Sequence, residues 1–153
     1  ESQMSIRITH QTGAADFERV QQAYVDAGFK DARVLTFIDD MASAYKKADL
    51  ILCRAGATTI AEVTVCGRPL IMIPFPFAVD DHQTANAKTV EASGGGIHLA
   101  QSELEPKHLF DLLNELTGTP ERLIEMANHS KKMGKPEALR DITDALEQEV
   151  AHV

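Results

Sequence analysis

Short apolar runs alternate with amphipathic stretches along most of this chain. Runs of four apolar residues, as at positions 50–53 and 70–73, are typical of a parallel strand that is covered on both faces. The pattern predicts strands at residues 4–9, 34–35, 50–53, 70–73 and 97–99. It predicts helices at residues 16–27, 40–48, 59–66, 83–92, 106–116, 121–132 and 137–150. Strands that alternate with helices indicate an α/β fold with a parallel sheet and right-handed crossovers.

Composition and charge limit the number of domains and the classes of partner that this chain can have. The chain has 153 residues, of which 44% are hydrophobic and 25% charged, as expected of a single globular domain over residues 1–153. The formal net charge of −8 provides no electrostatic attraction for nucleic acid, so we expect no nucleic-acid partner. No apolar run approaches the roughly 20 residues of a membrane span, and no signal peptide is visible. Cys53 and Cys66 lie in apolar segments, which indicates reduced core thiols and a cytosolic setting.

The segment 54–59 follows a predicted strand and precedes a predicted helix, where open α/β sheets bind ligands. It is built of small residues and contains Gly56, so a ligand can approach the backbone closely. The helix after it offers free N–H groups and the positive end of its dipole, which suit a phosphate group. The alternative is an ordinary strand–helix turn.

Glu62 has two competing interpretations. Thr59 and Glu62 have the spacing of a capping box, in which the Glu62 side chain accepts a hydrogen bond from the Thr59 N–H. The functional alternative is that this carboxylate, one turn into the helix, accepts two hydrogen bonds from a ribose diol. Both roles require the same oxygens.

The second polar segment spans residues 74–86. Asp80, Asp81 and His82 are residue types that bind metals, but adjacent side chains rarely face one ion. An acidic residue that complements the dipole of the next helix is the better interpretation of Asp80 or Asp81. Gln83 and Asn86 lie three residues apart on one helical face, a spacing that allows both to contact a polyol.

The segment 37–41 follows the second predicted strand. Phe37 and Ile38 either flank a planar base or belong to the core. We interpret Asp39 and Asp40 as helix caps rather than as an acid–base pair. In the helix that follows, Tyr45 has core-facing spacing. Neither cysteine has a histidine nearby in the sequence, so the chain offers no support for a thiol nucleophile.

Taken together, these segments resemble a known family. They read Phe-Ile-Asp-Asp-Met at 37–41, Cys-Arg-Ala-Gly-Ala-Thr-Thr-Ile-Ala-Glu at 53–62, Gly-Arg-Pro at 67–69, Pro-Phe at 74–75 and Asp-His-Gln-Thr-Ala-Asn at 81–86. In order and spacing they are similar to the carboxyl-terminal domain of the MurG family, glycosyltransferase family 28. His-Gln-Thr-Gly at 10–13 also fits, and the similarity runs from about residue 6 to the last helix.

The resemblance implies an enzyme that converts lipid I to lipid II in bacterial peptidoglycan synthesis. Its fold would be GT-B, in which this Rossmann-like half, with helices on both faces of the sheet, holds UDP-GlcNAc. The amino-terminal half would hold the undecaprenyl-linked muramoyl peptide acceptor. The enzyme would be peripheral on the cytoplasmic side of the inner membrane, with this segment itself soluble. No metal or other cofactor is implied.

Eleven positions match donor-binding positions of the family: Phe37, Ile38, Ala57, Thr58, Thr59, Ile60, Ala61, Glu62, His82, Gln83 and Asn86. By this resemblance the Ile38 backbone reads the uracil edge, with Phe37 beside it, and residues 57–61 face the diphosphate. Glu62 binds the ribose diol and Gln83 the GlcNAc hydroxyls. His82 and Asn86 are further candidates beside Gln83. No catalytic residue is assigned.

Some features of the family are missing from these residues. The opening strand with its Gly-Gly-Ser-type loop, the acceptor half and the catalytic base are absent, and Thr58 stands where a larger apolar residue is common. We therefore expect a fragment that is inactive alone.

Two other functions stay open. One is another GT-B enzyme that uses UDP-GlcNAc, such as an epimerase or a glycolipid transferase. The other is the donor-binding subunit of a split lipid-linked GlcNAc transferase.

Overall fold

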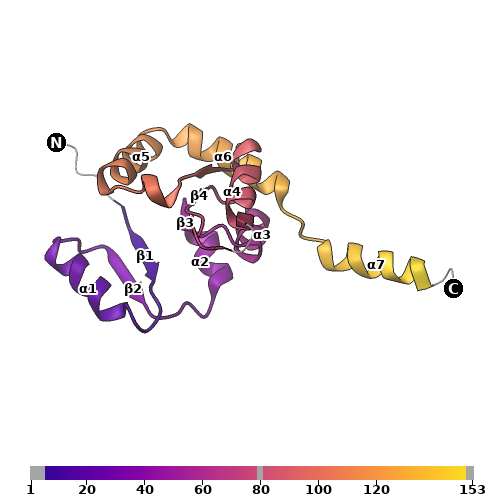
Figure 1. Cartoon of the computed structure of the whole chain (residues 1–153), viewed down its shortest axis with the longest axis horizontal. Helices are drawn as coiled ribbons and strands as arrows, with labels where there is room; N and C mark the ends of the chain where they lie inside the picture. The colour runs from indigo at the N-terminus through magenta and orange to yellow at the C-terminus, as the bar shows by residue number, and fades with distance from the viewer. Residues whose placement is uncertain (1–5, 79–80, 151–153) are drawn as a thin grey trace. The chain divides into compact units, whose positions relative to one another are not determined.

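A computed structural model describes residues 6–78 and 81–150, and the chain divides into two compact units (Figure 1). Unit 1 covers residues 1–44 and unit 2 covers residues 45–153. Each unit is described by itself. The helix α2 (Met41–Lys47) contains the boundary between them.

Unit 1 is a strand–helix–strand element. Its parallel strands β1 (Ile8–Gln11) and β2 (Ala32–Leu35) pair in a register that places Ile8 opposite Ala32. Between them lies α1 (Phe17–Asp26), after which Gly28 has a φ of +67°, a left-handed conformation that favours glycine. Parallel strands joined through a helix are the arrangement that the alternating pattern predicts.

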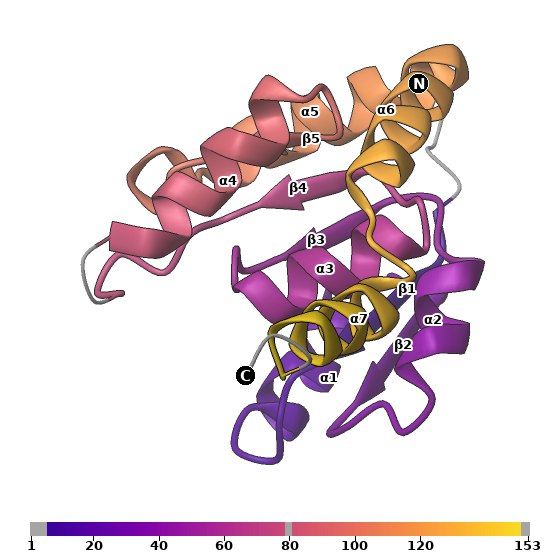
Figure 2. The same ribbon diagram turned by 90° about the vertical axis from the view of Figure 1, so that its right-hand side faces the viewer.

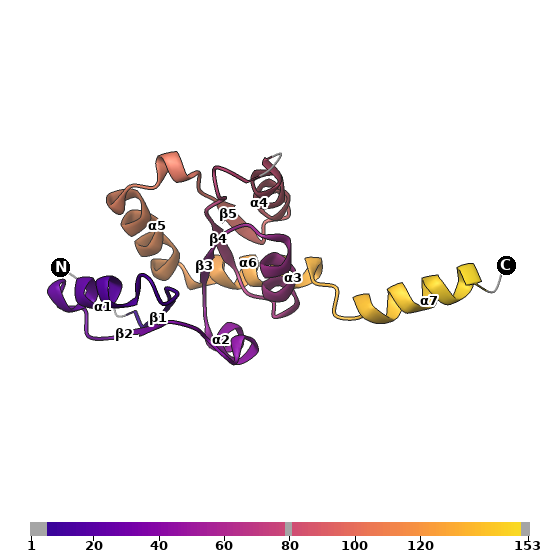
Figure 3. The same cartoon turned by 60° about the horizontal axis from the view of Figure 1, so that its bottom comes forward.

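Unit 2 holds a parallel sheet in the order β3-β4-β5, with the central strand visible in Figure 2. The strands are β3 (Ile51–Cys53), β4 (Leu70–Met72) and β5 (Gly96–His98). The helices are α3 (Ala57–Val65), α4 (His82–Ala92), α5 (Pro106–Gly118), α6 (Pro120–Met133) and α7 (Ala138–Val150), and a short 3-10 helix, η2, spans Gln101–Glu103. Figure 3 shows the strands between α3 and α4 on one side and α5 on the other.

Side chains of β4 and of the residue after it alternate between two core layers. Leu70 and Met72 pack with Val63 of α3 and Val90 of α4. Ile71 and Ile73, with Leu99, pack instead with Leu116 of α5 and Met126 of α6. Alternation with a period of two is the geometry of a strand, and here each face receives its own helical layer. This explains why the sequence at 70–73 is continuously apolar.

The predicted α/β class with parallel strands is confirmed. The strands form two hydrogen-bonded groups, β1-β2 and β3-β4-β5, one in each unit. The predicted helices are all present, with ends shifted by at most two residues: α3 begins at residue 57 instead of 59, and α5 ends at residue 118 instead of 116. Positions 4 and 5 of the first predicted strand lie outside the described residues, as do positions 79 and 80 of the predicted loop. In the part of the chain that the structure describes, no helix combines the length and the apolar character that a membrane crossing requires.

Gly96 offers a test of the packing around β4. A Cβ at this position would lie 2.8 Å from the Met72 Cε atom and 2.9 Å from the Leu70 carbonyl oxygen, so backbone must shift to admit it. We expect Gly96→Ala to lower the free energy of unfolding by about 1–3 kcal/mol, the usual cost of overpacking. Urea denaturation measures this change.

The matched control is Gly118→Ala at the end of α5, where a Cβ would meet no described atom within 4 Å. Since alanine favours helix, this variant should be unchanged or up to about 1 kcal/mol more stable. Equal stability of the two alanine variants would contradict the packing described for β4 and β5.

Candidate functional site

The candidate site lies where β3 and β4 end, because parallel strands place their carboxyl ends at one edge of a sheet. The loop after β3 leads into α3, and the loop after β4 leads into α4. Nine of the eleven predicted donor-binding residues lie in α3 and α4 of unit 2, at positions 57–62, 82, 83 and 86. The other two, Phe37 and Ile38, follow β2 in unit 1.

The first turn of α3 presents unsatisfied backbone donors. Gly56 is the N-cap, with φ −68° and ψ 140°, and its carbonyl accepts the Ile60 N–H at 3.0 Å. The N–H groups of residues 57–59 therefore precede the first intrahelical bond. No side chain caps this end, and its first turn has no acidic residue. Donors and dipole together make the turn suitable for an anion.

The capping-box interpretation of Thr59 and Glu62 is wrong. Because Gly56 adopts the extended N-cap conformation, the helix begins at Ala57, and Thr59 is already the third helical residue. A capping box requires Thr59 itself to be the N-cap. The Glu62 carboxylate lies one turn too far along α3 for that role and instead accepts a hydrogen bond from Tyr45.

Tyr45 is the residue of α2 that contacts Glu62. Its Oη donates to Glu62 Oε2 at 3.3 Å, and its ring packs against the core layer of α3 and α4. Burial, followed by the charge and hydrogen bond of Glu62, raises the pKa of Tyr45 to about 12. The sequence predicted only a core position for Tyr45. The overlooked signal was that a tyrosine on a core-facing stripe needs a partner for its hydroxyl.

Gln83 and Asn86 each use one end of the side-chain amide to hold a loop. Gln83 Oε1 accepts the backbone N–H of Phe75 at 3.0 Å, which ties α4 to the loop after β4. Asn86 Nδ2 donates to the carbonyl of Ala55 at 3.1 Å, which ties α4 to the loop after β3. The Gln83 amide nitrogen and the Asn86 amide oxygen take no part in these two bonds.

Arg54 connects the two loops and was not predicted as a site residue. Its Nη1 donates to the carbonyls of Ile73 and Pro74, each at 3.1 Å, and to Gln101 Oε1 at 2.7 Å. The guanidinium carbon lies 5.6 Å from the centre of the Phe75 ring, within cation–π range. The only sequence signal was a single arginine directly after the apolar run at 50–53, which the sequence predicts to be covered on both faces; in the structure Leu52 of that strand is 49% exposed.

The acidic residues at the start of α4 were predicted to complement the helix dipole rather than to bind a metal. Asp81 is the N-cap of α4, with a φ of 52°, and its Oδ1 accepts the Thr84 hydroxyl at 2.6 Å. Its place at the helix start agrees with the predicted dipole role. Asp80 lies outside the described residues. Among residues 6–78 and 81–150 there is no group of three or more His, Cys, Asp or Glu side chains that could hold a metal ion.

The residues after β2 have a separate geometry within unit 1. Ile38 donates its backbone N–H to Gln11 Oε1 at 2.9 Å, and Phe37 is 65% exposed, so Phe37 is not a core residue. Asp40 Oδ1 accepts the Ser43 N–H at 3.0 Å, which confirms Asp40 as a helix cap. Gln11, in the His-Gln-Thr-Gly segment, was not singled out by the sequence as a partner of Ile38.

The cysteines are free thiols, as expected, and each is partly buried. Burial raises the pKa of Cys53 to about 11, so this thiol stays protonated at neutral pH and is a poor nucleophile. Cys53 packs against the core layer of α3 and α4.

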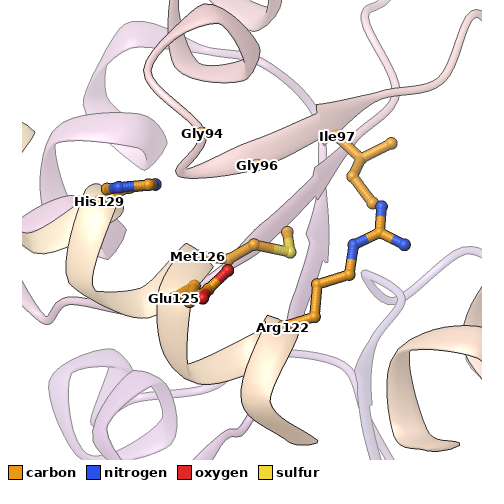
Figure 4. A pocket seen from close by; sticks show the side chains of 7 residues that line it. All are labelled: Gly94, Gly96, Ile97, Arg122, Glu125, Met126 and His129. Carbon is orange, nitrogen blue, oxygen red and sulfur yellow. The ribbon is translucent and has the colours of Figure 1, made fainter. Parts of the chain in front are cut away.

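The described residues of unit 2 enclose hollows at two places that bear on the site. One, of about 300 Å³, lies between α3 and α4, and Ala57, Ile60, Ala61 and Asn86 contribute to its lining. The other, of about 290 Å³, lies between α6 and the turn into β5 (Figure 4). Its lining residues are Gly94, Gly96, Ile97, Arg122, Glu125, Met126 and His129. Because it opens at the amino-terminal end of β5, it lies away from the edge where parallel sheets bind ligands.

Comparison with known proteins identifies the family of this chain. The profile of the "Glycosyltransferase family 28 C-terminal domain" matches residues 1–142. A protein of Myxococcus xanthus is 47% identical over 140 residues, which cover 92% of this chain and 36% of that protein. A protein of Syntrophotalea carbinolica is 47% identical over 129 residues, which cover 84% and 36%. Both are named UDP-N-acetylglucosamine--N-acetylmuramyl-(pentapeptide) pyrophosphoryl-undecaprenol N-acetylglucosamine transferase.

Solved structures of glycosyltransferases also resemble this chain. The crystal structure of Acinetobacter baumannii MurG superposes with a TM-score of 0.86 at 40% identity, covering 94% of this chain and 41% of that one. Glycosyltransferase VinC, at 15% identity and a TM-score of 0.66, shares the fold over 95% of this chain and 35% of its own. The chain thus spans well under half the length of these relatives. Sequence match, identity and structure agree that this chain belongs to glycosyltransferase family 28 and corresponds to its carboxyl-terminal domain.

Proposed function

We propose that the complete gene product that carries these 153 residues transfers N-acetylglucosamine from UDP-GlcNAc to an undecaprenyl-linked muramoyl peptide, converting lipid I to lipid II. The observation that carries the proposal is the 47% identity, over 92% of this chain, to a transferase named for that reaction. The uncapped start of α3 at the ligand-binding edge of the sheet supports it, because the donor is an anionic diphosphate.

The diphosphate is proposed to bind the first turn of α3. The backbone N–H groups of Ala57, Thr58 and Thr59 donate to phosphate oxygens, and Ile60 and Ala61 support this turn from behind. Such a site requires no excess of basic residues, since the donors are backbone groups reinforced by a local dipole. It therefore fits a chain whose formal net charge is −8. In this proposal no metal ion is needed to hold the diphosphate.

Two residues are proposed as nucleoside contacts, Ile38 in unit 1 and Glu62 in unit 2. The Ile38 backbone reads the uracil edge and Phe37 lies beside the base. Since the Ile38 N–H is bonded to Gln11 in this structure, either Gln11 moves away or the Ile38 carbonyl makes the contact. The Glu62 carboxylate accepts the ribose hydroxyls. Its exposure and its freedom from a capping role support this assignment.

The sugar is proposed to bind at the start of α4. Because the Gln83 carbonyl oxygen accepts from Phe75, the Gln83 amide nitrogen is the group that donates to a GlcNAc hydroxyl. His82 and Asn86 are secondary contacts beside it.

In the proposed transfer, the 4-hydroxyl of the muramoyl sugar attacks C1 of GlcNAc with inversion. The bond from C1 to the phosphate oxygen breaks, and UDP leaves. The hydroxyl proton passes to a base outside these residues, in the acceptor-binding part of the enzyme.

The remaining partners follow from the acceptor. A lipid-linked substrate requires the enzyme to work at a membrane surface, and we propose the cytoplasmic face of the bacterial inner membrane. The acceptor-binding part, not this domain, would make that contact.

The test of function is transfer of radiolabelled GlcNAc from UDP-GlcNAc to a lipid I analogue by the complete gene product. Formation of a lipid II analogue is expected. Conversion of UDP-GlcNAc without a lipid acceptor would instead identify an epimerase. Activity that appears only after a second polypeptide is added would identify a donor-binding subunit.

Replacement of Glu62 tests the ribose contact. Gln can still accept the Tyr45 hydroxyl and no cap is lost, so Glu62→Gln should change the free energy of unfolding by less than about 0.5 kcal/mol. A ribose diol donates to a carboxylate more strongly than to an amide. Hydrogen bonds to charged groups contribute roughly 1.5–3 kcal/mol, so UDP-GlcNAc binding should weaken about tenfold or more.

The control for Glu62→Gln is the 2′-deoxy donor, measured by calorimetry on both proteins. The unaltered enzyme should bind it less well than UDP-GlcNAc, and the variant should discriminate far less. An equal penalty for the deoxy donor in both proteins would show that Glu62 does not contact the ribose.

Replacement of Gln83 tests the sugar contact. In Gln83→Glu a carboxylate oxygen can still accept the Phe75 N–H, while the amide donor is lost. The ratio of affinities for UDP-GlcNAc and UDP should fall about tenfold, as expected when a sugar hydroxyl loses its donor. Repulsion between the new charge and the diphosphate is at least as strong for UDP, whose terminal phosphate carries additional charge, so repulsion alone cannot lower this ratio. An unchanged ratio would mean that Gln83 holds the loop but does not bind the sugar.

A further inference from the structure

The contact between Tyr45 and Glu62 joins two residues of unit 2 that lie 17 positions apart in the sequence. Tyr45 projects from α2 and Glu62 from α3, and the hydroxyl donates to Oε2 of the carboxylate at 3.3 Å. Among residues 6–78 and 81–150, no other group donates a hydrogen bond to this carboxylate. The only protein group that orients the exposed Glu62 side chain, within these residues, is therefore the Tyr45 hydroxyl.

The two partners differ in how firmly they are held. The Tyr45 ring packs against the buried cluster that includes Val63 and Leu70, so its hydroxyl has a defined position. Glu62 is exposed, and an exposed glutamate ordinarily samples several rotamers. Because the pKa of Tyr45 is raised to about 12, the hydroxyl keeps its proton throughout the physiological range and acts as a constant donor. The hydrogen bond from the fixed Tyr45 hydroxyl therefore restricts the rotamers of the Glu62 side chain.

We propose that Tyr45 is a positioning residue for donor recognition, holding the Glu62 carboxylate in the orientation that accepts the ribose diol. The inference rests on the proposed function, in which Glu62 binds that diol. A carboxylate has about four lone-pair sites, so the bond from Tyr45 leaves enough acceptor capacity for two ribose hydroxyls. Tyr45 thus favours ribose over deoxyribose without touching the nucleotide.

The size of the effect follows from the hydrogen-bond length. A separation of 3.3 Å is longer than the usual separation, about 2.7 Å, of a strong O–H···O bond. A modest contribution is therefore expected. Loss of one such bond should weaken UDP-GlcNAc binding about two- to tenfold, less than loss of the carboxylate itself.

The experiment compares UDP-GlcNAc with its 2′-deoxy analogue on the Tyr45→Phe variant of the complete gene product, by calorimetry. Phenylalanine keeps the packed ring and removes only the hydroxyl. The affinity for UDP-GlcNAc should fall more than the affinity for the analogue, so the ratio between them should shrink at least about twofold. Both ligands are measured on one preparation, so a reduced folded fraction cancels in the ratio.

Two further variants separate positioning from general destabilisation. Adding Tyr45→Phe to Glu62→Ala should leave the ratio of Glu62→Ala unchanged, because alanine leaves no side-chain acceptor at position 62 for the hydroxyl to orient. Tyr24→Phe is the matched control. It also removes the hydroxyl of a half-buried tyrosine, but that hydroxyl lies 3.2 Å from His10 Nδ1 in unit 1, so the ratio should stay at its original value.

The outcomes distinguish this inference from the proposed function. If Tyr45→Phe keeps the original ratio while Glu62→Gln reduces it, Tyr45 does not position Glu62, and the ribose contact stands. If the unaltered enzyme binds both ligands equally well, the ribose contact itself is absent. Reduction of the ratio by Tyr45→Phe in both the presence and the absence of the Glu62 carboxylate would also overturn the inference.

Discussion

The rest of unit 2 depends on the burial of β4 between two helical layers. Leu70 and Met72 face α3 and α4, while Ile71 and Ile73 face α5 and α6, and each is at most 9% exposed. Each such side chain contributes roughly 1.5–3 kcal/mol of hydrophobic stabilisation. Because neither layer is complete without this strand, the end of β4 has a defined position. The loops that carry the candidate site start from that position.

Side chains from neighbouring elements satisfy the loop backbone at this edge of the sheet. Arg54 bonds the carbonyls of Ile73 and Pro74, Gln83 the N–H of Phe75 and Asn86 the carbonyl of Ala55. The first turn of α3 differs, since no side chain caps it. The loops are held by these side chains, and the backbone donors at the start of α3 are unused. Such a site is preorganised for an anionic ligand, because little reorganisation would be needed on binding.

Local electrostatics, not net charge, decide what such a site can bind. The chain carries a formal charge of −8, yet charges beyond about 8 Å are largely screened at physiological ionic strength. Within that range, the dipole of α3 and its free N–H groups would act directly on an anionic ligand at this turn. The neutral hydroxyl of Tyr45 adds a donor at Glu62 without adding charge. An acidic domain can therefore serve an anionic donor.

The sequence by itself determined the order of strands and helices, because apolar periodicity is a local property of the chain, and its spaced motifs identified the family. Tertiary structure alone decided how particular side chains are used. Glu62 has capping-box spacing, yet the extended Gly56 starts α3 early and Tyr45, from another helix, becomes its partner. The sequence likewise showed Gln83 as a polar residue, but only its bond to Phe75 determines which end of the amide stays available. Such choices arise from contacts between elements that folding brings together, and no local pattern encodes them.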